Sequence, residues 1–368
     1  MSQLARAHSW GGLVLRIRHS GVTDHPFLVK MAKEHGNGSL RMLNVKSVSR
    51  LLVKELPATS LMIYPLTVFI LGNLLFDRIG APFSGHVLQA AASVKAGANP
   101  NEAISDGHVW AATAVLYLLV SFFVLLALLR WMRVRAKGYL FFGYLSIAGL
   151  LIALGISYLA DVDRYNRPFK AVFLFTFRSL QVDRRLYVGS ILDSINNTLL
   201  IINLLSVIVP AFLCAFGPLL VREPNGAWTE EELIKRVKDA RLLALMASIF
   251  LVAGVLHMYA WMSWAPELLN KDGLETVVGS VAFYWGSVFT MMLASYYFPI
   301  LLVLRNRAEA VMVVSEEVPL IERDQWLERR GLSLRIANQV PQMIGILGPL
   351  IAAPAGKFLA TLSVFFPK

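Results

Sequence analysis

The chain has 368 residues, of which 56% are hydrophobic and only 16% are charged, and its formal net charge is +11. This composition departs from that of soluble domains in the direction that membrane insertion requires. We expect no nucleic-acid role, because no basic cluster is interleaved with base-stacking aromatic residues. We also expect a non-enzymatic protein, because the sequence has no P-loop, HExxH or GxSxG motif.

Charged residues are segregated from the long apolar blocks. Among the 35 basic and 24 acidic residues, only Asp193 and Lys357 lie inside such a block. Soluble helices carry a charged face, so this segregation indicates that lipid is the solvent of the blocks. The sequence therefore predicts an all-α integral membrane protein with a bundle of six transmembrane helices plus a C-terminal apolar helix.

The N-terminal region, residues 1–58, is hydrophilic and basic. Within it, residues 40–56 mix leucines with four Lys and Arg residues, which predicts an amphipathic helix lying on anionic lipid headgroups. No cleavable signal peptide is predicted at the start of the chain, so we expect the first apolar block to act as its own insertion signal.

Six apolar blocks form the predicted membrane domain, residues 59–304. Each is long enough to cross a hydrocarbon core about 30 Å thick, which takes about 20 helical residues. Pro210 and Pro218 lie in the fourth block, where we expect a kink or tilt. The blocks are residues 59–76, 109–129, 139–160, 191–221, 242–262 and 279–304.

Basic residues predict the orientation of the bundle. With a cytoplasmic N-terminus, the inner segments hold 24 Lys and Arg residues and the outer segments hold nine. The positive-inside rule therefore favours a multi-pass protein of the inner or plasma membrane with its N-terminus in the cytoplasm. Segment 161–190 is the misfit, because it holds six of the outer basic residues. Its aromatic stretch 169–177 is too short to span, and we interpret it as interfacial or re-entrant.

Two charged segments flank the last spans. Residues 229–241 begin with Thr229 and three glutamates and end with basic residues, which predicts a capped helix that continues into the fifth span. Residues 305–340 form a charged cytoplasmic segment; acids and bases are balanced over 305–336, which is typical of a solvated helix. At the span ends, Trp110, Trp131, Trp261 and Trp264 are placed as an interface belt would place them.

The C-terminal region, residues 341–368, is apolar but contains several prolines and Lys357. We interpret it either as a seventh span or as an interfacial or re-entrant helix. Small residues recur in it every four positions, a spacing that lets two helices approach closely. This ridge predicts either self-association, for example around a pore, or packing within the monomer. Its members are Gly348, Ala352, Gly356 and Ala360.

Polar residues within the spans are candidates for a solute pathway. One group of hydroxyls shares a face of the sixth span, where it could line a path or hydrogen-bond between helices. Asn196 and Asn203 share a face of the fourth span. Asp193, at the outer edge of that span, is interpreted as a boundary residue or, if it faces the bundle, as a cation or proton site. The hydroxyl group consists of Ser280, Tyr284, Ser287 and Ser295.

Two histidines on the outer side, His108 and His257, are the candidates for a haem or metal site. No local ligand motif accompanies them, so we expect interfacial roles and no cofactor. Cys214 is the single cysteine, which excludes a disulfide within the chain.

These patterns predict a non-enzymatic, oligomeric membrane protein that forms a pore or a membrane-embedded platform for partner proteins. A solute transporter or transporter subunit is the alternative, and a haem-binding electron carrier is the third. The predicted partners are the lipid bilayer and either further copies of the chain or other membrane proteins.

Overall fold

The computed structural model describes ten stretches of the chain, and within them every regular element is a helix. The amphipathic helix predicted over 40–56 and nearly all of segment 161–190 lie outside these stretches. The described helices belong to one unit, Lys54–Lys368. The stretches are residues 58–92, 100–136, 138–160, 176–177, 180, 189–224, 228–269, 273–315, 323–329 and 336–362.

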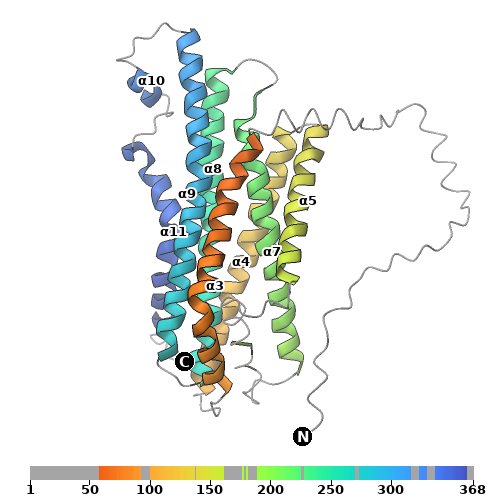
Figure 1. Ribbon diagram of the computed structural model, residues 1–368, viewed down its shortest axis with the longest axis vertical. Helices are drawn as coiled ribbons and strands as arrows, with labels where there is room; N and C mark the ends of the chain where they lie inside the picture. Colours follow the sequence, from red (N-terminus) through yellow and green to blue (C-terminus); the bar gives the residue numbers. More distant parts are fainter. Residues whose placement is uncertain are drawn as a thin grey trace, which may run out of the picture. The chain divides into compact units, whose positions relative to one another are not determined.

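Long helices dominate the fold and lie side by side (Figure 1). A short 3-10 helix, η1 (Ser60–Met62), leads into the first of them, and a short helix precedes the last. The remaining elements are α3 (Ile63–Ala92), α4 (Pro100–Arg135), α5 (Tyr139–Ala160), α7 (Gly189–Val221), α8 (Glu230–Leu269), α9 (Gly273–Ser315), α10 (Arg323–Arg329) and α11 (Ile336–Leu362).

Six of these helices are long and apolar enough to cross a membrane. This confirms the predicted all-α class and, for the described residues, the predicted number of long apolar helices. Each apolar stretch overlaps one predicted block, and the second, fifth and sixth stretches extend past their blocks through charged residues. The stretches are Ser60–Arg78, Asp106–Arg135, Tyr139–Tyr158, Ile191–Val221, Glu230–Trp264 and Glu275–Val311.

Helix α8 is the packing centre of the described bundle. It contacts α4, α7, α9 and α11, whereas α5 packs mainly against α7. Accordingly, 56% of the most apolar window of α8 is buried, against 17% of that of α5. A helix covered on several sides buries its side chains against its neighbours, while a largely uncovered one presents its apolar side chains to the surroundings.

Side-chain contacts fix the directions of the helices. Helices α4 and α8 are antiparallel, because Arg135 pairs with Glu232 near one end while Trp110 contacts Trp261 near the other. Helices α7 and α9 are parallel: the Tyr296 hydroxyl donates to the Leu213 carbonyl, and farther along both helices Arg307 pairs with Glu223.

The start of α8 follows the predicted capping pattern. The backbone N–H of Glu232 donates to the Thr229 hydroxyl at 3.3 Å, and three glutamates occupy the first helical turn. Acidic side chains at this end are favoured by the helix dipole. The prediction of a capped helix that runs directly into the fifth span is confirmed.

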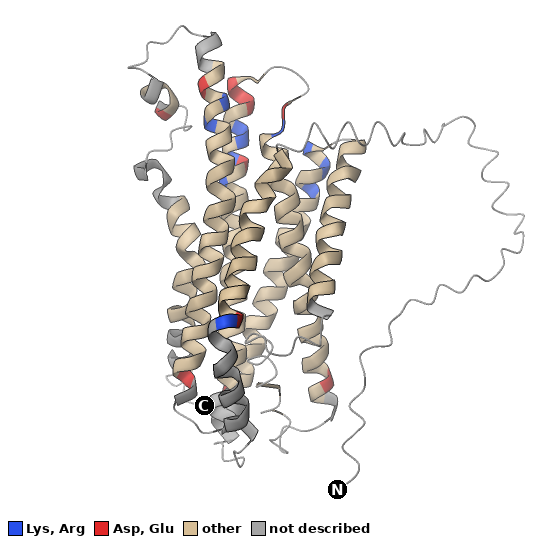
Figure 2. Ribbon diagram, in the orientation of Figure 1, with Lys and Arg blue, Asp and Glu red and all other residues tan. Residues whose placement is uncertain are grey.

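The charged segment after the sixth span includes the end of α9 and all of α10. Helix α9 continues to Ser315, and α10 covers Arg323–Arg329. The segment predicted as a solvated helix over 305–336 is helical in its described parts; residues 316–322 and 330–335 lie outside the described residues, so a single helix over the whole range stays a prediction. Most Lys and Arg residues coloured in Figure 2 lie toward one end of the long helices.

Helix α11 is continuous over 27 residues and contains three prolines. It runs parallel to α8: Gly345 meets Ser248, and Gly356 meets Tyr259 eleven residues farther along both helices. It also crosses α9, where a Cβ on Gly286 would lie 2.6 Å from the Pro349 carbonyl oxygen. The described part of the C-terminal region, in α11, is thus packed along the apolar part of α8.

Candidate functional site

The small-residue ridge of α11 faces α8 of the same chain. A Cβ on Gly348 would lie 3.0 Å from Ser248 and from Val252, and one on Gly356 would lie 2.9 Å from Tyr259. Ala352 is buried. Of the two alternatives for this ridge, these contacts support packing within the monomer. The side chain of Ala360 lies outside the described residues, and a role of the ridge in self-association stays a prediction.

A proline explains one hydrogen bond across this contact. Pro349 has no amide hydrogen, so the Gly345 carbonyl four residues earlier loses its usual helical donor. The Ser248 hydroxyl of α8 donates to that carbonyl instead. The sequence gives one signal of such a bond, a proline within an apolar helix, but it does not identify the donor.

The hydroxyls of the predicted stripe on α9 mostly bond to their own helix. Ser280 donates to the Thr276 carbonyl and Ser287 to the Phe283 carbonyl, each at 2.8 Å and each four residues back. Ser295 likewise donates to the Met292 carbonyl at 2.8 Å. Hydroxyls used in this way are hydrogen-bonded without a partner helix or water.

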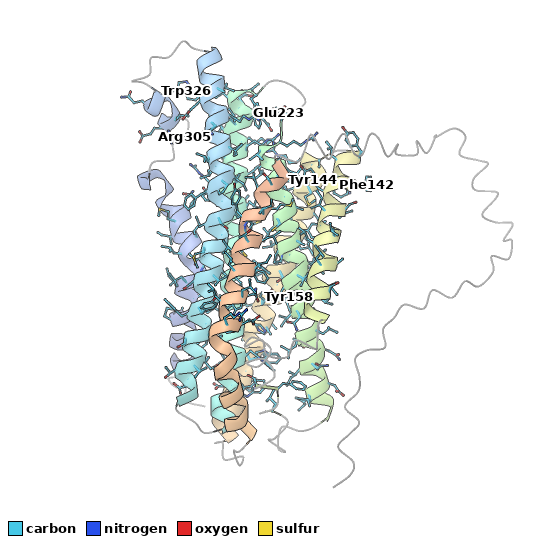
Figure 3. All side chains as sticks on the ribbon, in the orientation of Figure 1. Phe142, Tyr144, Tyr158, Glu223, Arg305 and Trp326 are labelled. Atoms are coloured by element: carbon cyan, nitrogen blue, oxygen red, sulfur yellow. The ribbon has the colours of Figure 1, made fainter. Side chains whose placement is uncertain are left out.

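Tyr284 is the member of the stripe that bonds across helices. Its hydroxyl donates to the Gly72 carbonyl of α3 at 2.7 Å. On the same part of α3, Asn73 accepts a 2.9 Å hydrogen bond from Tyr158 of α5, whose position beside α3 is labelled in Figure 3. These two bonds tie α3 to α9 and to α5 through polar groups inside predicted spans.

The polar residues of α7 point away from the packed interior. Asp193 and Asn196 are exposed, and Asn203 is half-buried. The exposure of Asp193 agrees with its interpretation as a boundary residue. In this arrangement Asp193, Asn196 and the α9 hydroxyls do not line a common interior path, and their role in a pathway stays a prediction.

The two candidate histidines differ in environment. His108 is exposed, whereas His257 is buried, with ring centroids 6.3 Å from Trp110 and 5.8 Å from Tyr117. Ring packing on both sides gives His257 a role in the α4–α8 contact. Within the described residues, no group of three or more His, Cys, Asp or Glu residues could hold a metal ion.

Three tryptophans assigned to an interface belt are buried together between α4 and α8. Trp110 stacks on Trp264 at 5.6 Å and tilts against Trp261 at 5.5 Å. Trp131 instead contacts Phe216 of α7 at 5.5 Å. These contacts show that the tryptophans pack between helices. Their positions in the sequence identified the ends of the spans but not the rings that they contact.

An ionic cluster that the sequence did not predict joins three helices at the opposite end of α8. Glu232 accepts hydrogen bonds from Arg135 of α4 at 2.9 Å and from Arg236 at 2.6 Å. Arg135 also pairs with Asp239. The only sequence signal is the four-residue spacing of Glu232 and Arg236, since the partner on α4 is 97 residues away.

Arg236 also caps the C-terminal end of α7. Its Nη1 donates to the carbonyls of Leu219, Leu220 and Arg222 at 2.6, 3.0 and 3.1 Å. The last carbonyls of a helix have no intrahelical donor, and a cation there also interacts favourably with the helix dipole. The guanidinium lies 5.3 Å from the centre of the Trp228 ring, which adds a cation–π contact.

The outer face of α5 is the least covered surface of the six long apolar helices. Phe142 is 63% exposed and projects outward (Figure 3). The residues Ser146, Gly149, Ala153 and Ser157 are exposed at helical spacing on one face. Their small size is favourable for helix–helix contact in lipid.

Comparisons with known proteins give no assignment: no family model, no curated protein and no solved structure matches the chain. Function is therefore inferred from the residues of this chain.

Proposed function

We propose that the protein is a multi-pass protein of the inner or plasma membrane that acts without catalysis as a membrane-embedded platform for partner proteins. The N-terminus is cytoplasmic, and assembly takes place with further copies or with other membrane proteins. The six apolar helices support membrane insertion, and the segregation of charge supports the orientation.

One observation favours a platform over a pore within the single chain. Three hydroxyls of the candidate pathway on α9 are already bonded to their own helix, while Asp193 and Asn196 face outward. A water or ion path needs polar groups that replace hydration along its wall. A platform needs an uncovered face, and α5 has one.

A liposome flux assay distinguishes a platform from a pore. The purified protein is reconstituted, and release of a potassium-sensitive dye and of a small neutral dye is compared with that from protein-free vesicles. We expect no added release in either assay. Release above the protein-free level that is lost when Ser287 is replaced by leucine would support a pore and contradict the platform.

Photo-crosslinking tests the platform directly. A photoreactive amino acid is placed at Gly149 of α5 and, as a matched control, at Gly279 of α9, because an added Cβ would meet no atom within 4 Å at either position. We expect the Gly149 variant to form a discrete protein adduct in native membranes and the Gly279 variant to label lipid. Lipid adducts alone at both positions would overturn the platform proposal.

A further inference from the structure

Two arginines lie about one helical turn apart near the C-terminal end of α4. Arg130 and Arg133 are both exposed. Residues three apart on a helix are neighbours, so the two side chains lie on the same side of α4. Like charges on neighbouring positions of one helix face repel each other, and a bound anion relieves that repulsion. This side of α4 is therefore a favourable place for an anion.

The acidic residues that pair with this end of α4 lie on its opposite side. Glu232 and Asp239 of α8 both pair with Arg135. Arg133 comes two residues before Arg135, which is about 200° around the helix, so it points away from α8. Neither Arg130 nor Arg133 forms an ion pair with another described residue of the chain. The described helices therefore leave the charge of these two arginines without a carboxylate partner.

An apolar stripe continues from the two arginines along the same side of α4. Leu126 is 48% exposed, Phe123 is 66% exposed and Leu119 is 51% exposed. They precede Arg130 by four, seven and eleven positions, a spacing that keeps side chains on one helix face. Tyr117, two residues before Leu119, instead packs against α8. The two arginines and the three apolar residues thus form one surface that points away from α8, which we call the arginine face of α4.

We propose that the arginine face of α4 binds an anionic phospholipid, with the phosphate held by Arg130 and Arg133 and an acyl chain along the apolar stripe. Arginine pairs with a phosphate through two parallel N–H donors. The stripe favours a lipid over a free phosphate, because a soluble anion gains nothing from apolar side chains. The orientation rule accounts for the number of bases at this end of the helices but not for two arginines on one face. The proposal rests on the membrane insertion in the proposed function and not on the platform role.

Native mass spectrometry of the full chain in detergent tests this site. Phosphatidylglycerol and phosphatidylcholine with identical acyl chains are the probes. Attraction of two basic residues for an anionic headgroup predicts that the wild-type chain prefers phosphatidylglycerol by about 10-fold. R130Q/R133Q is expected to bind both lipids equally.

The matched control is K235Q/K238Q, which removes the same charge from two exposed positions three apart on α8. On that helix Glu231 lies one turn before Lys235 on the same face, so a carboxylate is already present there. We expect this variant to keep most of the preference for phosphatidylglycerol. Equal losses of preference in the two variants would show a general attraction to basic charge and would overturn the site on α4.

Soluble glycerol phosphate distinguishes a lipid site from a phosphate site. At the same concentration as the lipid, it should not displace phosphatidylglycerol from the wild-type chain, because it cannot occupy the apolar stripe. Displacement would overturn the proposal, as would equal binding of the two lipids by the wild-type chain or an unchanged preference in R130Q/R133Q. Thermal melting of each variant confirms that it is folded. Carbonate extraction of the expressed protein reports membrane insertion separately, so failure of the lipid site is distinguished from failure of the proposed membrane location.

Discussion

At the residue scale, the guanidinium of Arg236 links α8 to the C-terminal end of α7. It is buried, pairs with a carboxylate of its own helix, and donates to three carbonyls at the end of another helix. Removing one partner of a buried charge pair leaves the other charge uncompensated, which costs more than the pair itself contributes. The end of α7 is therefore sensitive to a single substitution on α8.

We expect R236Q to lower the free energy of unfolding by about 3 kcal/mol, because the α7 carbonyls lose their donors and Glu232 keeps only Arg135. Unfolding in mixed detergent micelles, followed by tryptophan fluorescence, measures this change. R305Q is the matched control, since Arg305 and Glu309 form a pair with 35% and 37% exposed side chains. That variant is expected to change stability by less than about 0.5 kcal/mol. Equal effects of both variants would contradict this role for Arg236.

Ser248 is a second residue whose contribution to stability depends on a backbone group that is distant in the sequence, the Gly345 carbonyl. We expect S248A to lower the free energy of unfolding by about 1 kcal/mol. The Gly345 carbonyl then has neither the serine hydroxyl nor the N–H of residue 349 as a hydrogen-bond donor. In a P349A background the returned N–H satisfies that carbonyl, so the same substitution should cost less than half as much. S146A on α5 is the control, since Ser146 donates to its own helix. An S248A cost that is identical with and without Pro349 would reject this explanation.

At the scale of elements, the crossing of α9 and α11 requires glycine at one position. A methyl group on Gly286 would lie 2.6 Å from a backbone oxygen of α11, which cannot rotate away as a side chain can. On the same helix, Gly279 meets no atom within 4 Å. These two glycines share a helix and differ only in what faces them.

G286A is expected to destabilise the protein by about 1–3 kcal/mol, as overpacking does elsewhere. G279A should be neutral or slightly stabilising, because alanine favours helix more than glycine does. Thermal midpoints measured in one detergent compare the two variants. A larger loss in G279A than in G286A would show that α11 does not cross α9 at this point.

The sequence predicted the long helices better than it predicted the contacts between them. Runs of apolar residues ended by charges located the six long helices, although several of these helices extend about ten residues or more past the predicted blocks, because insertion in lipid constrains the apolar part of a helix and not its full length. The ridge from Gly348 to Gly356 was identified from spacing, yet spacing is the same whether the facing helix is α8 or another copy. The Arg135–Glu232 pair joins residues 97 positions apart, and no local pattern encodes such a contact.

At the scale of the whole molecule, the direction of α11 bears on topology. It is parallel to α8 and antiparallel to α9, as the next crossing after α9 would be. Its 27 residues correspond to about 40 Å of helix, and its apolar stretch, Gln342–Gly356, is shorter than those of the six long apolar helices. Because of its direction, we propose α11 as a seventh span, which places the two chain ends on opposite sides of the membrane.

Epitope tags at the two ends test this arrangement. In sealed right-side-out vesicles, we expect a C-terminal tag to react with antibody and an N-terminal tag to react only after permeabilisation. Inside-out vesicles should give the reverse result, which controls for masking of a tag. Reaction of both tags from the same side would show that α11 does not cross.

The bond between Ser248 and Gly345 also bears on how the protein is made. For α11 as the proposed seventh span, the Gly345 carbonyl freed by Pro349 has no donor before the helix docks, and an unsatisfied backbone group in hydrocarbon is destabilising. Docking against α8 removes that cost. Under the proposal that α11 spans the membrane, its insertion during biosynthesis is thereby coupled to the prior presence of α8, which precedes it along the chain.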